Sequence, residues 1–196
     1  MTLRRIIHSA SALLTFASLL AANGALAQSA SEGEAPKLFA DLSSSTRFYP
    51  NANAALTGFT LGSLYKPSEK CVHIAGELFA RFGRKDATPE DLKMRTAGGA
   101  IGALWGTGDW DHWFGAGAMF DLGWGRVGAK DEFVSSAYLR ALLLWRLRGE
   151  FWVNLDVRTG YVIAPITVND VGIKGPLIGL GIGVSWGKDE DEYAPN

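Results

Sequence analysis

Residues 150–163 read Glu-Phe-Trp-Val-Asn-Leu-Asp-Val-Arg-Thr-Gly-Tyr-Val-Ile, and successive side chains alternate in polarity. The apolar set is Phe151, Val153, Leu155, Val157, Tyr161 and Ile163. The opposite set is Asn154, Asp156, Arg158 and Gly160. A period of two residues is the period of an extended chain. The stretch therefore predicts a β-strand with one hydrocarbon face and one charged face.

Two neighbouring stretches repeat this pattern. Residues 137–147 alternate Ala, Leu and Trp with Tyr138, Arg140 and Arg146, and residues 178–186 alternate Ile, Leu, Val and Trp with glycine and serine. Hydrocarbon on one face of successive strands and charge on the other are typical of a sheet that meets lipid outside and encloses a polar lumen. The pattern therefore predicts a transmembrane β-barrel. Residues 136–147 also contain strong helix formers, so an amphipathic helix is the alternative there.

The N-terminus has the composition of an export signal. Arg4 and Arg5 precede an apolar run, and Ala25-Leu26-Ala27 forms a small-residue cleavage site, so residues 1–27 are predicted to be a cleaved secretory signal peptide. This segment holds two of the 19 Lys and Arg residues and none of the 20 Asp and Glu residues, so the mature charge is 17 − 20 = −3. That balance gives no reason to expect nucleic acid as a partner.

The mature chain has no run of eighteen apolar residues, so only strands could cross a membrane, and strands cross only as a closed barrel. We expect a polar lead-in at 28–36, a barrel at 37–188 and an acidic tail at 189–196. The predicted fold is all-β: a single closed antiparallel up-and-down barrel of eight strands. Turn signals place the strands at 37–48, 55–65, 72–84, 93–106, 113–126, 135–148, 151–163 and 177–188.

The predicted connections alternate in length. The second, fourth and sixth are short (66–71, 107–112 and 149–150), whereas the third, fifth and seventh are longer (84–91, 127–135 and 164–176). Bacterial barrels have short periplasmic turns, longer outer loops and both termini in the periplasm. The alternation therefore predicts a bacterial outer-membrane topology with the odd-numbered loops outside.

Tryptophans gather at the strand ends that this topology places on the periplasmic side. We interpret them as an aromatic girdle at the lipid–water boundary. The alternative is the general preference of aromatic residues for strands. The predicted girdle consists of Trp105, Trp113, Trp145, Trp152 and Trp186.

Charged residues are predicted to face the lumen. The interior of an eight-stranded barrel is only wide enough for side chains to fill, and buried charges must pair. The main hypothesis is a structural cluster in which Glu77, Asp121 and Asp156 pair with Arg81, Arg140 and Arg158; the alternative is a proton- or ion-conducting path. The other residues assigned inward are Asp41, Arg47, His73, Arg95, Arg146 and Asn154.

No catalytic, cofactor or metal site is predicted. The glycine repeats at 98–102 and 179–183 resemble phosphate-binding loops, but no helix follows either, so we interpret them as packing positions. His73 and His112 are the only mature histidines, and neither forms a recognisable Ser/His/acid arrangement. Cys71 is the single cysteine and cannot form an internal disulfide.

The last predicted strand carries one motif-like piece. Gly181 is followed by alternating apolar residues, including Val184, that end in the aromatic Trp186. In this the chain resembles the small eight-stranded outer-membrane barrels, the class of the transmembrane domain of outer-membrane protein A and of the outer-membrane protein W group. The resemblance covers the mature chain as architecture. It implies that the barrel-assembly machinery reads this strand, although here the chain continues into the acidic tail.

Three functions follow from these observations. The first is a non-enzymatic, porin-like but side-chain-filled barrel, expected to be a monomer, that contributes to outer-membrane structure or interactions among lipid and lipopolysaccharide. The second is a lipid A-modifying enzyme of the same shape, for which an acid/base site near the outer leaflet is missing. The third is a periplasmic lipocalin-like binder, which the inward-facing charges disfavour.

Overall fold

The structure is a computed structural model that describes residues 38–52, 54–67, 71–85, 92–108, 111–168 and 171–188. The predicted signal peptide, lead-in and acidic tail lie outside these residues, so those predictions stand untested. Among the described residues there is no helix long and apolar enough to cross a bilayer.

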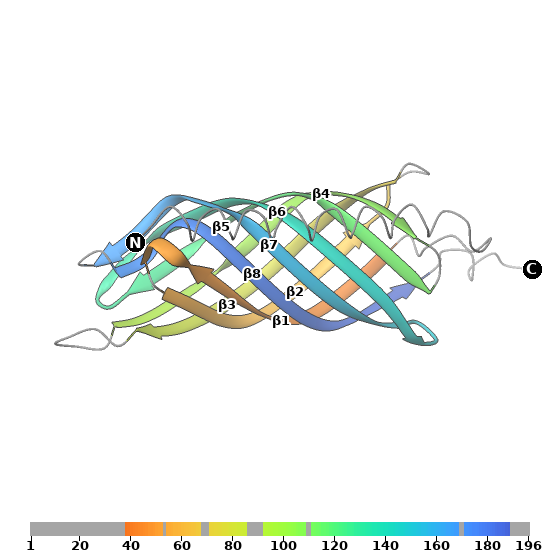
Figure 1. Cartoon of the computed structure of the whole chain (residues 1–196), viewed down its shortest axis with the longest axis horizontal. Coiled ribbons are helices and arrows are strands. Elements are labelled where there is room, and N and C mark those ends of the chain that lie inside the picture. The colour runs from red at the N-terminus through yellow and green to blue at the C-terminus, as the bar shows by residue number, and fades with distance from the viewer. Residues whose placement is uncertain are drawn as a thin grey trace, which may run out of the picture.

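Eight strands close into one antiparallel barrel (Figure 1). Each strand pairs with the next, and β1 closes the barrel on β8, in a register that runs from Leu38↔Lys188 to Phe48↔Ile178. The predicted fold class is confirmed. The strands are β1 (Leu38–Tyr49), β2 (Ala54–Tyr65), β3 (Val72–Lys85), β4 (Leu92–Gly108), β5 (His112–Val127), β6 (Lys130–Arg148), β7 (Phe151–Val168) and β8 (Val171–Lys188), with a short 3₁₀ turn at Pro50–Ala52.

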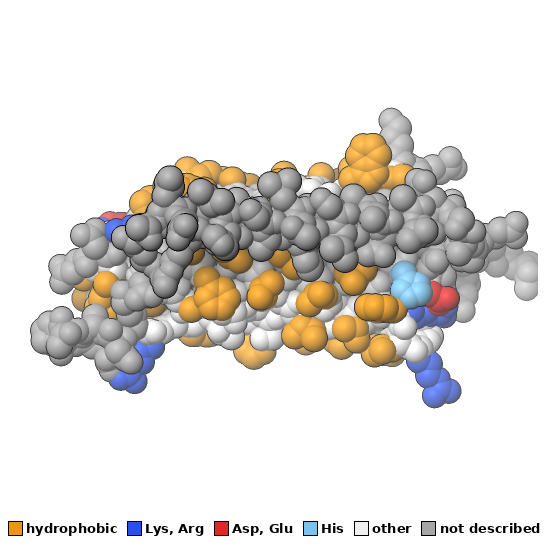
Figure 2. All heavy atoms as spheres, in the orientation of Figure 1, with side chains coloured by type: hydrophobic (Ala, Val, Ile, Leu, Met, Phe, Trp, Pro, Cys, Tyr) orange, Lys and Arg blue, Asp and Glu red, His pale blue; other side chains and the backbone are white. Residues whose placement is uncertain are grey.

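The barrel has its hydrocarbon outside and its charges inside. On β7 the side chains of Asp156 and Arg158 are 1% exposed, whereas Leu155 is 44% and Tyr161 59% exposed. Hydrophobic side chains are spread along the visible wall, and the charged side chains in view lie at its ends (Figure 2). The face assignment made from residues 150–163 is therefore correct. Residues 136–147 belong to β6, so the helical alternative for them is wrong.

Two predicted long connections are absent. β6 begins at Lys130 after a two-residue turn in which Gly128 has a φ of 60°, a left-handed conformation that favours glycine. β7 runs on to Val168 and β8 begins at Val171. The predicted loops at 127–135 and 164–176 are therefore wrong, and with them the alternation of long and short connections.

The proline in β7 explains one of these errors. Pro165 has no backbone N–H to donate to a ladder, which in a sequence suggests a loop. In the barrel it lies within a register shift between Val162 and Ile166, where the β7–β8 pairing is interrupted and then resumes as far as Val168↔Val171. A bulge thus absorbs the proline, and the strand continues beyond it.

The interior is filled in three layers. We call the end where β1 begins and β8 ends the terminal end, and the opposite end, with Pro50–Ala52, the loop end. At the terminal end the ring of Phe39 lies 6.0 Å from that of Trp113 and 5.3 Å from that of Trp152. Charged side chains fill the middle. Buried apolar residues fill the loop end: Leu56, Met94, Val127, Val134, Ile166 and Ile173.

The lipid-facing assignment can be tested by introducing an arginine at two different depths along the outer wall. Leu155→Arg on β7 should destabilise the folded barrel by up to about 2–4 kcal/mol, because an arginine on the lipid face is most costly near the bilayer midplane. The matched control is Leu147→Arg near the terminal end of β6, which should cost about 0–1 kcal/mol. Urea unfolding in phospholipid vesicles measures both. Equal costs at the two positions would contradict the lipid-facing assignment.

Candidate functional site

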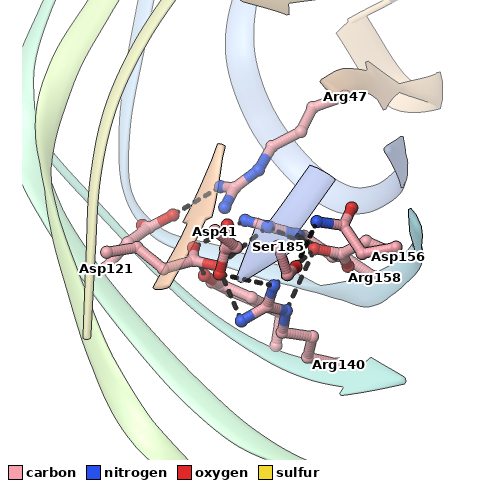
Figure 3. A network of polar contacts seen from close by, with 10 residues as sticks. Asp41, Arg47, Asp121, Arg140, Asp156, Arg158 and Ser185 are labelled. Atoms are coloured by element: carbon pink, nitrogen blue, oxygen red, sulfur yellow. Dashed lines mark hydrogen bonds and ion pairs between the residues drawn. The ribbon is translucent and has the colours of Figure 1, made fainter. Parts of the chain in front are cut away.

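The charged layer is built from five strands. Four arginines and four carboxylates are at most 5% exposed among the described residues. Seven side chains of this layer and its edge are labelled in Figure 3, where they converge from the barrel wall onto a common centre. The four arginines and four carboxylates of the charged layer are Asp41 and Arg47 of β1, Glu77 and Arg81 of β3, Asp121 of β5, Arg140 of β6, and Asp156 and Arg158 of β7.

Glu77 and Arg158 form the centre of the layer. Arg158 donates from Nη1 to Glu77 Oε2 at 2.8 Å and from Nη2 to Oε1 at 2.9 Å. This two-pronged contact matches the planar guanidinium to the planar carboxylate, the strongest arrangement for such a pair. The two residues lie 81 positions apart in sequence, so only barrel closure brings them together.

Asp156 joins two arginines. Arg140 Nε donates to Asp156 Oδ2 at 3.0 Å, and Arg158 Nε donates to Oδ1 at 3.1 Å. Arg140 also approaches Glu77, with Nη1 2.8 Å from Oε1, close enough for an ion pair but not aligned for a hydrogen bond. Two carboxylates and two guanidiniums thus form one closed set of contacts.

Asp41 lies at the margin of this set. Its Oδ2 is 4.0 Å from Nη2 of Arg140, and neither carboxylate oxygen has a hydrogen-bond partner among the described residues. Asp41 therefore gains long-range attraction without direct hydrogen bonds.

Asp121 pairs with Arg47, an inward arginine that the sequence hypothesis did not include among the three pairing arginines. Nη1 of Arg47 forms a buried ion pair with Asp121 Oδ2. The guanidinium of Arg47 lies 4.7 Å from the ring centroid of Tyr138, and that of Arg158 lies 5.7 Å from the same ring. Tyr138 also donates weakly to Glu77 at 3.4 Å. Tyr138 therefore joins the Arg47–Asp121 pair to the central set, a role that sequence reasoning missed.

The predicted carboxylate pairing of Arg81 is wrong. No carboxylate in the described part of the chain lies within ion-pair distance of Arg81, and its Nε and Nη2 atoms have no hydrogen-bond partner there. Its guanidinium instead lies 3.8 Å from the ring centroid of Phe79, a cation–π contact. Parity placed Arg81 inside correctly, but it could not say which of two inward arginines would reach Asp121.

Inward glycines make room for the charged side chains, as the sequence interpretation held. A Cβ at Gly62 would collide with the carboxylate of Asp41. A Cβ at Gly179 would lie 3.2 Å from Arg158 Cβ, and one at Gly181 would lie 3.4 Å from Asp156 Cβ. These glycines therefore leave room for charged side chains directly opposite them on the neighbouring strands.

One residue assigned to the lumen lies elsewhere. Arg95 is exposed on the outer wall near the loop end of β4. It is near a strand end, where an outward charge is close to water and loses its main cost. The inward assignment of Arg95 is therefore wrong.

Arg146 lies on the inward side at the terminal end of β6, opposite the buried Trp152. Its Nε donates to the backbone oxygen of Gly149 at 2.7 Å, and Nη1 is 3.5 Å from Asp111 Oδ1. Arg146 therefore faces the rim of the lumen and does not join the charged layer.

The aromatic girdle divides in two. Trp105, Trp145 and Trp186 are 70%, 55% and 41% exposed on the outer wall, as a girdle requires. Trp113 and Trp152 are at most 1% exposed and fill the lumen, so their girdle assignment is wrong. The position of each tryptophan in the alternation shows that it faces inward. Trp152 lies on the same strand face as Asn154 and Asp156, and Trp113 lies on the same face as Asp121.

Both histidines pack against tryptophan at the terminal end. His73 is buried, with its ring 4.9 Å from that of Trp113, and His112 lies 5.6 Å from Trp145. Cys71 is a free, exposed thiol. In the described part of the chain no three His, Cys, Asp or Glu side chains are grouped closely enough to hold a metal ion.

The chemistry open to the charged layer is limited by the contacts that its members make with one another and by the small space around them. The carboxylates of Glu77 and Asp156 both form ion pairs with Arg140 and Arg158. The space beside Arg47 and Arg81 is a cavity of about 10 Å³, room for about one water molecule. A substrate cannot reach these groups without displacing packed side chains.

The fold has counterparts among solved structures. Neisserial surface protein A (NspA) matches with a TM-score of 0.51 and 16% identity, over 77% of this chain and 96% of that one. The attachment invasion locus protein Ail of Yersinia pestis matches with a TM-score of 0.47 and 10% identity, over 76% of this chain and 95% of that one. No family model and no curated protein matches the sequence. The architecture is that of the small eight-stranded outer-membrane barrels.

The layer predicts a contrast between two buried arginines. Arg158→Met should destabilise the barrel by about 3–5 kcal/mol, because it removes a partner from two buried carboxylates. Arg81→Met should be neutral or stabilising, because no carboxylate is orphaned and an uncompensated buried charge disappears. Urea unfolding in detergent micelles or vesicles measures both.

A second variant checks that the cost comes from the orphaned charge. Glu77→Gln together with Arg158→Met should cost less than the sum of the two single changes. Equal losses for the two arginines, or simple additivity in the double variant, would contradict the pairing scheme.

Proposed function

We propose that this protein is an integral outer-membrane β-barrel, closed by its own side chains and without catalytic activity, that contributes to the structure and interactions of that membrane. One observation carries the proposal: the polarity of the sheet is inverted relative to a water-soluble protein. Large hydrophobic residues such as Phe59, Leu78 and Trp105 are 65–70% exposed, whereas all the arginines of the charged layer are buried. Only a hydrocarbon surrounding makes this arrangement favourable.

The proposed topology has the loop end outside the cell and both termini in the periplasm. Even-stranded bacterial barrels share this orientation. The exposed tryptophans at the terminal end support a membrane boundary there, and Trp124, 61% exposed toward the loop end, supports a second boundary.

The closed lumen supports a role other than transport. Aromatic rings fill the terminal end, the ion-paired layer fills the middle, and aliphatic side chains fill the loop end. An aqueous path would have to pass all three. The same packing argues against a lipocalin-like binder, whose cavity would be open and apolar.

A non-enzymatic role is supported by the placement of the titratable groups. The carboxylates of the charged layer lie within the barrel, and both histidines lie at the end farther from the proposed outer leaflet. The lipid A-modifying alternative needs a base and a nucleophile near that leaflet, and no observation favours it.

The partners in this proposal are outer-membrane lipid, lipopolysaccharide and, during biogenesis, the barrel-assembly machinery. In β8, Val184 and Trp186 face outward and Gly181 faces inward. This alternation along the last strand is a pattern that the assembly machinery could read. The barrel closes on itself through β1 and β8, which leaves no free sheet edge and supports a monomer.

Membrane residence is tested by fractionation. We expect the mature protein, beginning at Gln28, in the outer-membrane fraction, extracted only by detergent and migrating faster on gels before heating than after it. N-terminal sequencing of that band locates the cleavage site. Recovery as a soluble periplasmic protein without detergent would overturn the proposal.

Closure of the lumen is tested by conductance. Purified protein in a planar lipid bilayer should give no stable ion current, because three packed layers block the path. A porin with an open aqueous channel, reconstituted in the same way, is the positive control for the measurement. Steady current through the wild-type protein would refute the closed lumen.

The absence of catalysis is tested on the membrane's own lipid. Mass spectrometry of lipid A from cells with and without the protein should give identical acyl and phosphate patterns. A changed pattern that disappears in His73→Ala or His112→Ala would establish an enzyme and reverse the proposed topology.

A further inference from the structure

Two arginines face each other on the outer wall near the loop end. In the β3–β4–β5–β6 register, Phe82 lies opposite Arg95, Arg95 opposite Arg126, and Arg126 opposite Asp131. Arg95 is exposed, and Arg126 is partly exposed, with 40% of its side chain accessible. This row of residues crosses the strands on the outer face of the barrel, which is hydrocarbon between the loop end and the terminal end.

The charges in this row do not balance. Like charges directly opposite each other on a sheet are destabilising. Arg126 Nη2 is 2.8 Å from Asp131 Oδ2, but Arg95 makes no ion pair or hydrogen bond with any described residue. An anion placed between Arg95 and Arg126 would relieve this repulsion.

A hollow of about 180 Å³ lies beside the two guanidiniums. Its floor includes the small side chains of Ala80 and Ala97, and its walls include Phe82 and Trp124, which are 59% and 61% exposed. A ligand here would meet the guanidiniums of Arg95 and Arg126 at the rim, beside the carboxylate of Asp131 that pairs with Arg126, and hydrocarbon immediately below them.

A larger, shallow groove adjoins the hollow on its terminal-end side and crosses β2–β5. Its volume is about 760 Å³, and its lining includes Leu78 of β3, Ile101 of β4 and Leu122 of β5. Two outward glycines, Gly76 and Gly99, also line it. Alkyl chains are the ligand that fits a shallow apolar groove on a lipid-facing wall.

From this geometry we infer a lipid A site on the outer wall of β3–β5. A lipid A phosphate binds between Arg95 and Arg126, which present planar donors suited to phosphate oxygens, and an acyl chain follows the groove over Gly99 and Gly76. The inference rests on the proposed function, because only an outer-membrane orientation brings the loop end to the leaflet that contains lipopolysaccharide.

Binding to lipid A tests the rim. Purified protein in detergent micelles is titrated with diphosphorylated lipid A, and retained lipid is counted by native mass spectrometry. Arg95→Gln with Arg126→Gln should weaken binding at least about tenfold, the effect of losing charge-assisted hydrogen bonds. The control Arg148→Gln removes an exposed arginine at the terminal end and should leave binding unchanged. Equal affinity of the double variant and the wild-type protein would overturn the inference.

The groove is tested by filling it. A Cβ at Gly99 would have its nearest heavy atom, the backbone oxygen of Glu77, at 3.4 Å, so a side chain is accommodated there. Gly99→Leu should weaken lipid A binding, whereas Ala141→Leu, which adds the same side chain outward on β6 opposite Ala116 and away from the groove, should not. Unchanged binding in Gly99→Leu would remove the groove from the site.

The ligand chemistry is separated by three probes. Dephosphorylated lipid A should bind at least about tenfold more weakly than lipid A, which reports the phosphate contact. Inorganic phosphate should not compete at concentrations matched to lipid A, because it lacks acyl chains. Phosphatidylglycerol that binds as tightly as lipid A would identify a general anionic-lipid surface and overturn the lipid A assignment.

The two proposals fail differently. If fractionation finds the protein in the outer membrane while every variant binds lipid A like the wild-type protein, only the lipid site is refuted. If the protein is soluble in the periplasm, the proposed function fails, and the lipid A site fails with it.

Discussion

The need to bury charge inside a narrow barrel shapes the interior of this protein. Four arginines and four carboxylates lie in a space only as wide as the side chains that fill it. Without water, each charge depends on a partner held at hydrogen-bond distance. The two-pronged contact of Arg158 with Glu77, and the bridging of Asp156 by two arginines, meet this requirement at the centre.

The layers on either side cover that centre. Trp113 and Trp152 close the terminal end, and apolar residues from β2 and β4–β8 close the loop end. Inward glycines such as Gly179 and Gly181 leave space on the wall beside the largest charged groups. The barrel is therefore a packed core whose middle is polar, and its lumen is suited to holding eight strands together rather than to passing solutes.

Because side chains fill the interior, the surface remains as the place for interaction with other molecules. Most of the outer wall is hydrocarbon, and the described ion pairs on its outside lie close to strand ends. The opposed pair Arg95 and Arg126 is unusual because their repulsion is only partly offset by Asp131. A site on the wall, rather than in the lumen, agrees with a protein whose barrel is already full.

Sequence alone determined which residues of the barrel wall face outward and which face the lumen. Alternation with period two assigned a face to each residue of 150–163, and the same rule placed Glu77, Asp121, Arg140 and Arg158 inside, because polarity on a strand depends only on local parity. It would also have placed Trp113 and Trp152 inside if parity had been weighed above their position at strand ends. Strand ends were less predictable, since Pro165 can begin a loop or occupy a bulge.

Pairing across the lumen was decided only by the tertiary structure. Arg47 and Arg81 both point inward toward the loop end, and nothing local distinguishes them as partners for Asp121. The shear of the closed barrel brings Arg47 to that carboxylate and leaves Arg81 against Phe79. The same closure sets Arg95 opposite Arg126 on the outside. Parity is a property of one strand, whereas distances across a barrel depend on the register of all eight.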